Sequence, residues 1–333
     1  MFKKLNYSIY LTLSIYLLSI GSVLACSSGC GTAFGNYGIG GPITTTPAYT
    51  LPQGKFVINT SLRYQNVDQF SNNTFRALDK THTHAHSHDS EMKTIATLAY
   101  GITDDFTISL SYPYRFLYGL KTHEEDNNII SGGNSIGFGD MTLLAKYRFL
   151  DPPLSQRFRL QAAILAGIKI PTGQGNERDE EGFKLPADEQ PGTGSWDPVM
   201  GLALSLPINN FSLDTNVNYK LSTQGHQQTT VGDLISFNSA LTYNFQEHTL
   251  FGQRIKHAAI FEMNGIWQEK LEESGIKDDG HGGLVIFLSP GLKTSINDYT
   301  VLDLQVGLPI ISDLNGTQPN TGIQLFAGIS KIF

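Results

Sequence analysis

Hydrophobic and polar residues alternate along much of this chain with a period of two. The segment 106–114, FTISLSYPY, places Phe106 and Leu110 on one face and Thr107 and Ser109 on the other. Successive side chains of a β-strand point to opposite faces, so the segment predicts a strand with an apolar and a polar side. The pattern recurs, and twelve strands are expected near residues 55–65, 92–101, 105–115, 135–149, 157–170, 196–208, 211–221, 233–245, 257–268, 283–294, 299–309 and 321–333.

The connections between these strands alternate in length. Tight turns are expected at 101–104, 209–210 and 297–298. Long polar connections are expected at 66–91, 116–134, 171–195, 222–232, 269–282 and 310–320, while 246–256 is long for its rim. Outer-membrane barrels have short periplasmic turns and long extracellular loops, and an even number of strands. The sequence therefore predicts an all-β fold: a transmembrane antiparallel β-barrel of about 12 strands with a short-turn rim and a long-loop rim.

Charged residues fall on the polar faces of the expected strands. Asp214 and Lys220 share a face that excludes Leu213 and Val217. A charge at the hydrocarbon midplane costs roughly 2 to 4 kcal/mol, so the polar faces are expected to line the lumen. The predicted lumen-lining residues are Asn59, Ser61, Arg63, Gln65, Asp214, Asn216, Asn218, Lys220, Asn238, Asn244, Glu262, Asn264, Asp303 and Gln305. A soluble, secreted β-sandwich also alternates, but it does not explain the two kinds of rim.

Composition is consistent with such a barrel. Charged residues make up 16% of the chain, against roughly 25% in an average soluble protein. The net charge of −7 favours neither nucleic acid nor an acidic membrane surface as a partner. The 14 tyrosines and 19 phenylalanines cluster near strand ends, where a girdle at the membrane surface would place them.

The N-terminus has the pattern of an export signal. Lys3 and Lys4 precede an apolar stretch from about residue 9 to 24, and small residues follow up to Ala25. This pattern indicates a secretory signal peptide and, with the barrel, the outer membrane of a Gram-negative bacterium. The expected organisation is a signal peptide (1–25), an irregular segment rich in Gly, Thr and Pro that is a lead-in or a plug (26–54), and the barrel (55–333).

The only two cysteines, Cys26 and Cys30, follow the expected cleavage site. In an oxidising periplasm they can form a small disulfide loop. The sequence V-L-A-C also resembles a lipoprotein cleavage box, in which Cys26 is acylated. Two thiolates can alternatively capture a soft metal ion. The sequence leaves these three alternatives open.

Four of the nine histidines lie in the segment THTHAHSHDSEM, on the long-loop rim. Alternate residues of an extended chain project to the same side, so the imidazoles of His82, His84, His86 and His88 can converge on zinc, copper or nickel. The alternative is a polar surface loop that binds metal only incidentally. The acidic loop 174–190 can likewise bind divalent cations or bridge to lipopolysaccharide, but a solvated acidic loop is the favoured interpretation.

No catalytic motif occurs in its required context. G-N-S-I-G at 133–137 matches the nucleophile elbow G-x-S-x-G, but that elbow requires a strand, a strained turn and then a helix. An outer-membrane hydrolase is therefore an outside hypothesis, since nothing selects a Ser, His and acidic triple. We expect that the protein is not an enzyme.

Several segments resemble a known family. These are YGITDDFTISLSYPY (100–114), GFGDMTLLAKYRF (137–149), GIKIPTG (167–173) and the final GISKIF. They resemble the outer-membrane transporter-like proteins of the MetA pathway of phenol degradation. The resemblance implies a channel-like barrel for uptake or efflux of small molecules and transfers no functional residue. The last strand, with Phe333 at its end and Lys331 interrupting its apolar face, also resembles the signal that the barrel-assembly machinery reads.

The resulting functional hypothesis is passage of a small solute, with a link to metal-ion handling. The alternative is a surface metal-binding or receptor protein that uses the histidine-rich loop. The expected partners are outer-membrane lipid and lipopolysaccharide, the barrel-assembly machinery, and the solute or metal ion, with no nucleic acid. No cofactor is expected apart from zinc, copper or nickel at the histidines.

Overall fold

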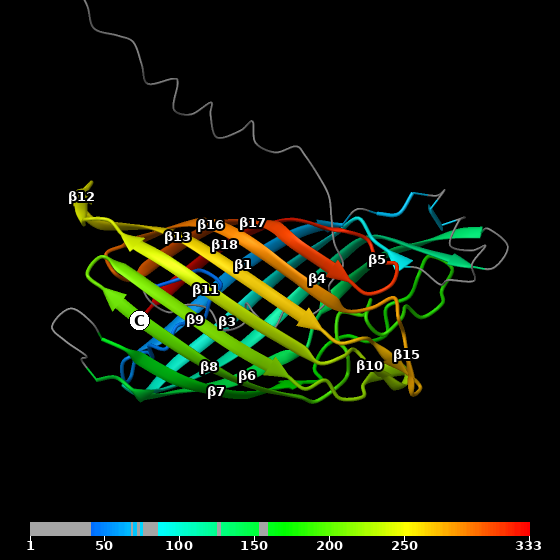
Figure 1. Cartoon of the computed structure of the whole chain (residues 1–333), viewed down its shortest axis with the longest axis horizontal. Helices are drawn as coiled ribbons and strands as arrows, with labels where there is room; N and C mark the ends of the chain where they lie inside the picture. Colours follow the sequence, from blue (N-terminus) through cyan, green and yellow to red (C-terminus); the bar gives the residue numbers. More distant parts are fainter. Residues whose placement is uncertain (1–40, 68, 72–73, 76–85, 125–127, 153–158) are drawn as a thin grey trace, which may run out of the picture.

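The computed structural model describes residues 41–333, except for 68, 72–73, 76–85, 125–127 and 153–158 (Figure 1). The long strands are β1 (Phe56–Val67), β3 (Ser90–Thr103), β4 (Phe106–Glu124), β5 (Asn128–Phe138), β6 (Met141–Leu150), β7 (Gln161–Ile170), β8 (Asp197–Ile208), β9 (Phe211–Lys220), β11 (Leu234–Asn244), β13 (Gln253–Gln268), β16 (Gly283–Ile296), β17 (Thr300–Leu314) and β18 (Thr321–Ile332). β5 and β6 both pair with β4, so they are successive parts of one strand of the barrel wall, and the thirteen long strands count as twelve around the barrel.

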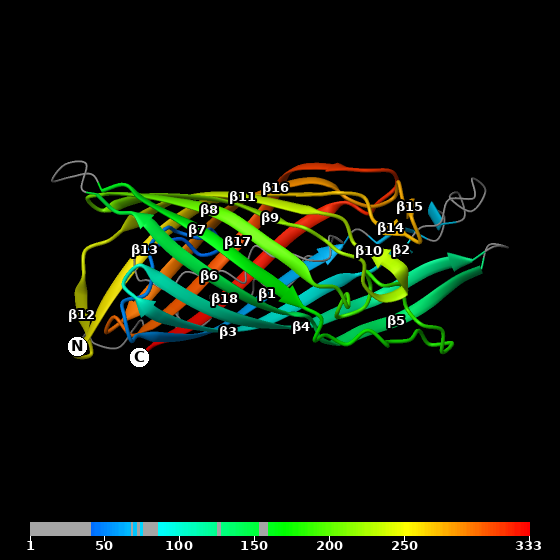
Figure 2. The same cartoon turned by 90° about the horizontal axis from the view of Figure 1, so that it is seen from below.

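These strands form a closed ring. Each is antiparallel to its neighbours, and the order around the barrel follows the chain. The ring closes where β1 pairs with β18, from Val57 opposite Ile332 to Val67 opposite Thr321. Figures 1 and 2 show the strands tilted against the long axis of the molecule. The predicted twelve-stranded antiparallel barrel is confirmed.

Several short elements lie between the long strands. They are β2 (His86–Ser87), η2 (His226–Gln228), β10 (Thr229–Thr230), β12 (His248–Leu250), β14 (Glu272–Glu273) and β15 (Ile276–Lys277). β10, β14 and β15 form a small sheet at the long-loop rim. Among the described residues, no helix is long and apolar enough to cross a membrane.

Some strands extend further than the alternation of residues indicates. The sequence predicts a loop at 116–134, but β4 continues to Glu124 and β5 begins at Asn128. β17 likewise continues into the expected loop and ends at Leu314. Strand pairing continues there beyond the residues that alternate strictly, so the expected loop boundaries were wrong.

The short-turn rim has tight turns at 209–210 and 297–298, as predicted, whereas the turn expected at 101–104 lies at 104–105 because β3 continues to Thr103. Asn297 and Asp298 both have positive φ (51° and 64°) and link β16 directly to β17. Such values at both central residues belong to type I′ turns, which match the twist of a hairpin. The unusually long connection 246–256 is explained by β12, which pairs with the start of β13 as a small hairpin.

The outer and inner faces differ as a membrane wall requires. Outward side chains are apolar and accessible, with Leu304 62% and Leu292 60% exposed, whereas the inward Glu262 is 0% exposed. Lys331 interrupts the apolar face at the short-turn rim, where its Nζ lies 5.9 Å from the ring centroid of Tyr299. The wall is therefore an apolar belt around a polar interior.

Candidate functional site

Residues 42–51 lie inside the barrel, and we call them the plug segment. They have no regular secondary structure and run through the lumen before β1 begins (Figure 2). Most of their side chains are buried. The lumen is thus filled by a separate stretch of chain that is not part of the strand ladder.

Glu262 on β13 anchors this plug segment. Its carboxylate accepts hydrogen bonds from the backbone N–H groups of Ile43, Thr44 and Thr45, those of Thr44 and Thr45 at 3.1 Å. It also accepts from the hydroxyls of Thr44 and Thr45. Successive backbone N–H groups that converge on one anion form a favourable anion site. Here the protein supplies the anion from its own wall.

Further hydrogen bonds hold the plug segment to five other strands. They run from Thr46 N to Asn216 Oδ1 (2.8 Å), Ala48 N to Ser205 Oγ (2.8 Å), Leu51 N to Thr107 Oγ1 (2.9 Å), Lys293 Nζ to Pro42 O (2.8 Å) and Lys146 Nζ to Pro47 O (3.2 Å). Buried polar groups are costly without partners, so these contacts satisfy both the plug segment and the wall.

Apolar side chains of the plug segment also have matching patches on the wall. Ile43 packs with Ala258, Ile260 and Phe326. Ala48 belongs to a second buried cluster on β6, β7 and β8, and Leu51 to a third near the short-turn rim. The segment is therefore held by side-chain packing as well as by hydrogen bonds.

Asparagine side chains form a ladder beside Glu262. Asn238 donates to Asn216 Oδ1 (3.3 Å), and Asn264 donates to Asn238 Oδ1 (3.2 Å). Asn264 also donates to Thr44 Oγ1 (3.0 Å). These asparagines are register partners on β9, β11 and β13, so strand pairing itself brings the amides into line.

Basic residues gather on another part of the interior. Arg63, Lys93 and Arg115 are register partners on β1, β3 and β4. Glu91 accepts from Arg115 Nε (2.7 Å) and lies 3.4 Å from Lys93 Nζ. This side of the lumen consequently has more positive than negative charge.

Loops 171–196 and 269–282, which we call the cap, meet above this basic region. Arg115 Nη1 donates to the carbonyl oxygens of Asp188 and Gln190, both at 2.9 Å. His281 contacts Asp278 through Nδ1 (2.8 Å) and Asp188 through Nε2 (3.3 Å). Despite the opposing effect of burial, these carboxylates raise the pKa of His281 to about 10. Burial, reinforced by Asp188, raises the pKa of Glu189 to about 8.

A second group of charges fixes the base of the cap. Lys169 Nζ lies 3.1 Å from Asp140 and 2.8 Å from Asp197. Asp140 also accepts from the backbone N–H groups of Gly173 and Thr193, both at 2.9 Å. Residues near both ends of loop 171–196 are thereby attached to the barrel.

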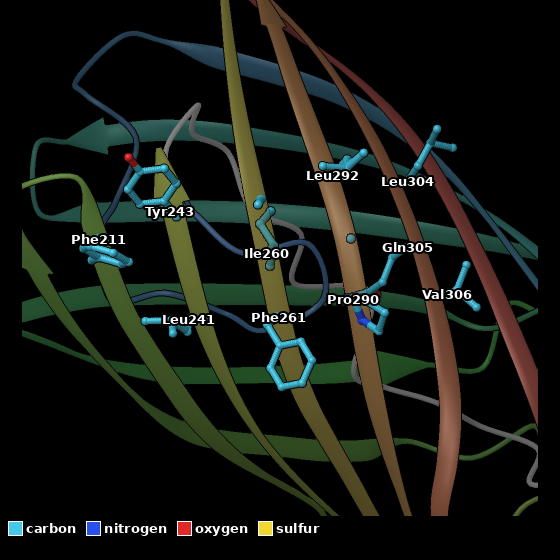
Figure 3. Close-up of a pocket in the computed structure, with 12 residues that line it drawn as sticks. Phe211, Leu241, Tyr243, Ile260, Phe261, Pro290, Leu292, Leu304, Gln305 and Val306 are labelled. Carbon is cyan, nitrogen blue, oxygen red and sulfur yellow. The ribbon is translucent and has the colours of Figure 1, made fainter. Parts of the chain in front are cut away.

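An apolar groove lies outside the lumen, on the lipid-facing wall. Figure 3 shows this groove of about 630 Å³, lined mainly by apolar side chains from β9, β11, β13, β16 and β17. Gly291 lies between this groove and the plug segment, since a Cβ there would lie 2.7 Å from Ile43 Cδ1. Its outward side chains belong to the apolar belt, so we do not assign a solute site to it.

The fourteen predicted lumen residues all lie at inward positions of their strands. Glu262, Asn216, Asn264 and Gln305 contact the plug segment. Asn244 lies at the short-turn rim, where its side chain donates to Asn210 O (3.4 Å).

The predicted metal ligands fall mostly on undescribed residues. Cys26, Cys30, His82 and His84 lie outside the described residues, and His86 is described only as part of β2. His88 is buried, and desolvation lowers its pKa to about 4. In the described part of the chain, no three His, Cys, Asp or Glu side chains are placed to hold a metal ion. Metal binding at these residues stays a prediction.

Sequence reasoning missed several residues that hold the plug segment. Lys146, Ser205 and Lys293 have the parity of the inward face in their strands, a signal that could have identified them. The same signal was available for Lys93 and Arg115, next to the predicted Arg63.

The sequence of residues 103–310 matches the family described as the MetA pathway of phenol degradation. This chain belongs to that family. The match covers more than half of the chain and includes Arg115, Glu262 and Lys293, while the plug segment and Arg63 precede it. No curated protein matches this family member in sequence.

Solved structures share its fold. The COG4313 outer membrane channel from Pseudomonas putida F1 is 14% identical, with a TM-score of 0.56 over 86% of this chain and 98% of that chain. The CymD monoaromatic hydrocarbon channel is 8% identical, with a TM-score of 0.37 over 85% and 89% of the two chains. At 14% identity, the first likeness shows that this family member has the barrel fold of an outer-membrane channel.

Proposed function

We propose that the protein is an outer-membrane channel for a small solute, closed by the plug segment and opened when that segment leaves the lumen. The observation that carries this proposal is the binding of three successive backbone N–H groups by Glu262. Hydrogen bonds and packing hold the plug segment, but no strand pairing does. It can therefore leave without breaking the ladder that closes the barrel.

The wall supports the same proposal. Its apolar exterior suits lipid, and its interior is lined by amides, hydroxyls and paired charges. Such lumen side chains set the selectivity of a pore by charge and hydrogen bonding. Export through residues 1–25 and insertion by the barrel-assembly machinery through β18 and Phe333 are part of the proposal.

The first test changes the anchor. Glu262→Gln keeps the size of the side chain but turns one acceptor oxygen into a donor, which faces the N–H groups of the plug segment. Hydrogen bonds to a charged group contribute about 1.5–3 kcal/mol, so the open fraction should rise about tenfold. The measurement is ion conductance of the purified protein in planar lipid bilayers.

The matched control is Glu247→Gln. Glu247 lies at the short-turn rim, 3.3 Å from Lys256, and does not contact the plug segment. Its variant should conduct like the wild type. Equal conductance of the wild type and Glu262→Gln would contradict the proposal.

A second test locks the plug segment in place. Thr44 Oγ1 and Asn264 Nδ2 are 3.0 Å apart, so Thr44→Cys with Asn264→Cys should form a disulfide under oxidation. The oxidised variant should stay closed and recover conductance when a reductant is added. Thr44→Cys alone, treated with the same oxidant, controls for pairing with the native cysteines. A locked variant that conducts like the reduced one would remove the plug segment as the gate.

A further inference from the structure

The basic residues of the lumen stand side by side on three strands. Arg63 is the register partner of Lys93, and Lys93 is the register partner of Arg115. Neighbouring strands lie about 4.8 Å apart, so three cationic side chains share one level of the wall. Like charges placed directly opposite each other are destabilising, so this row requires negative charge nearby.

The protein itself supplies only part of that charge. Glu91 contacts Arg115 and Lys93, and Arg115 is further held by two carbonyl oxygens of the cap. The side chain of Arg63 makes no hydrogen bond or ion pair with any residue that the structure describes, whereas the side chains of Lys93 and Arg115 both contact Glu91. Three cations face one carboxylate in this row, an excess of two positive charges.

Nearby titratable groups of the cap do not cancel the excess. Burial raises the pKa of Glu189 to about 8, so its carboxyl is mostly protonated at pH 7. The carboxylate of Asp188 contacts His281. The positive charge around Arg63 therefore persists at neutral pH.

Arg63 also lines a cavity at the surface of the plug segment. The cavity is about 30 Å³ in the closed state, which is room for one water molecule. Its lining combines the amides of Asn238, Asn264, Gln305 and Gln324 with the apolar side chains of Ile266, Phe287 and Phe326, and it includes Thr44 of the plug segment. Departure of the plug segment would therefore enlarge this cavity.

The two aromatic rings decide the kind of anion that fits. Phe326 is the register partner of Arg63, and it packs against Ile43 of the plug segment. A solute that replaces Ile43 would meet an aromatic ring beside a guanidinium group. Aromatic rings prefer to stack with other rings, and a guanidinium fork binds a carboxylate through two parallel hydrogen bonds. An inorganic anion would leave both rings without a partner.

We propose that Arg63, with Lys93 beside it and with Phe287 and Phe326, forms a lumenal binding site for a small aromatic monocarboxylate. This site deepens the proposed function and rests on it, because the ligand enters the site in exchange for the plug segment. The ligand and the plug segment compete for the same space, so the anion favours the open channel.

The test uses benzoate as the probe and isothermal titration of the detergent-solubilised full-length protein as the measurement. Arg63→Gln should weaken benzoate binding about tenfold or more, because a charge-assisted bidentate contact is lost. The affinity of Arg63→Lys for benzoate should lie between those of the wild type and Arg63→Gln, since lysine keeps the positive charge but cannot form two parallel hydrogen bonds. Phe326→Leu should weaken benzoate but leave acetate, which has no ring, unchanged.

The control is Lys331→Gln, which removes one positive charge at the short-turn rim and should bind benzoate like the wild type. Heat-dependent migration in gels shows which variants are folded. Equal affinity for benzoate and acetate, or undiminished benzoate binding by folded Arg63→Gln, would overturn the site. If the wild type binds benzoate but Glu262→Gln does not conduct, the proposal of a gated channel is contradicted and the proposed binding site stands. If Glu262→Gln conducts but no variant binds benzoate, the site fails alone.

Discussion

The outer wall and the lumen are built from the same strands, yet they constrain their side chains in different ways. On the outer wall, Leu302, Leu304 and Val306 are interchangeable in kind, because lipid requires only an apolar surface. In the lumen, Asp303 has a defined partner, Lys293 Nζ at 3.5 Å, which also holds Pro42. The outer face therefore depends on the class of residue at each position, and the inner face depends on its identity.

The largest expected effect comes from breaking a lumenal pair. Lys293 is 1% exposed, so Lys293→Met leaves the buried carboxylate of Asp303 without its cation. Removing one partner of a buried ion pair typically costs about 3–5 kcal/mol. The measurement is equilibrium unfolding in lipid vesicles, followed by the fluorescence of Trp196 and Trp267.

The double variant Lys293→Met with Asp303→Asn sharpens this result. Since the uncompensated charge is gone, most of the lost stability should return. If the double variant is as unstable as Lys293→Met, the loss comes from the contact with Pro42 or from packing, and not from charge.

A smaller effect is expected from placing one charge on either face. Leu304 faces lipid, and its neighbour Gln305 faces the lumen, where Thr44 contacts both Gln305 and Glu262. Leu304→Lys should destabilise the barrel by about 2–4 kcal/mol. Gln305→Lys should cost less than Leu304→Lys, because Glu262 in the lumen can pair with the new charge, whereas lipid offers it no partner.

Both variants are compared by the same unfolding measurement in vesicles. The contrast between the faces would be lost if the two substitutions had equal costs. Migration of the unheated protein in gels shows that each variant has inserted before it is unfolded.

The smallest expected effect is a pH dependence of the cap that the barrel does not share. A histidine with a raised pKa stabilises below its unfolded value near 6.5, and the contribution disappears as pH rises through about 10. Glu189 acts in the same direction, since stability is lost as pH rises through about 8. His88, with its lowered pKa, destabilises as pH falls through about 4. The cap should therefore be tightest below about pH 6.5 and should loosen as pH rises from there to about 10.

Cleavage of loop 171–196 by proteinase K measures this window. His281 is 28% and Asp278 49% exposed at the side chain, so solvent screening limits the effect to about 1 kcal/mol. Cleavage, corrected for the activity of the protease on a free peptide, should accelerate about fivefold from pH 7 to 10.5. His281→Gln should remove most of the change above pH 9; an unaltered profile would exclude His281 as the cause.

For the candidate site, the sequence predicted which residues point inward but not which groups they contact. Alternation identified Glu262, Asn216 and Arg63 as inward residues, because parity along a strand is local. It did not indicate that Glu262 would bind Ile43, 219 residues away. The sequence by itself also did not reveal that Lys293 is shared between Pro42 and Asp303, since both contacts cross between elements.

The sequence by itself determined the barrel, the number of its strands, the two rims and the lipid-facing belt, because each depends on patterns within a few residues. Only the tertiary structure decided which polar groups meet in the lumen. The pairing of β1, β3 and β4 sets the register that aligns Arg63 with Lys93 and Arg115, and closure of the ring encloses the plug segment beside Glu262. Those encounters depend on how distant strands are placed around one axis, which no local periodicity encodes.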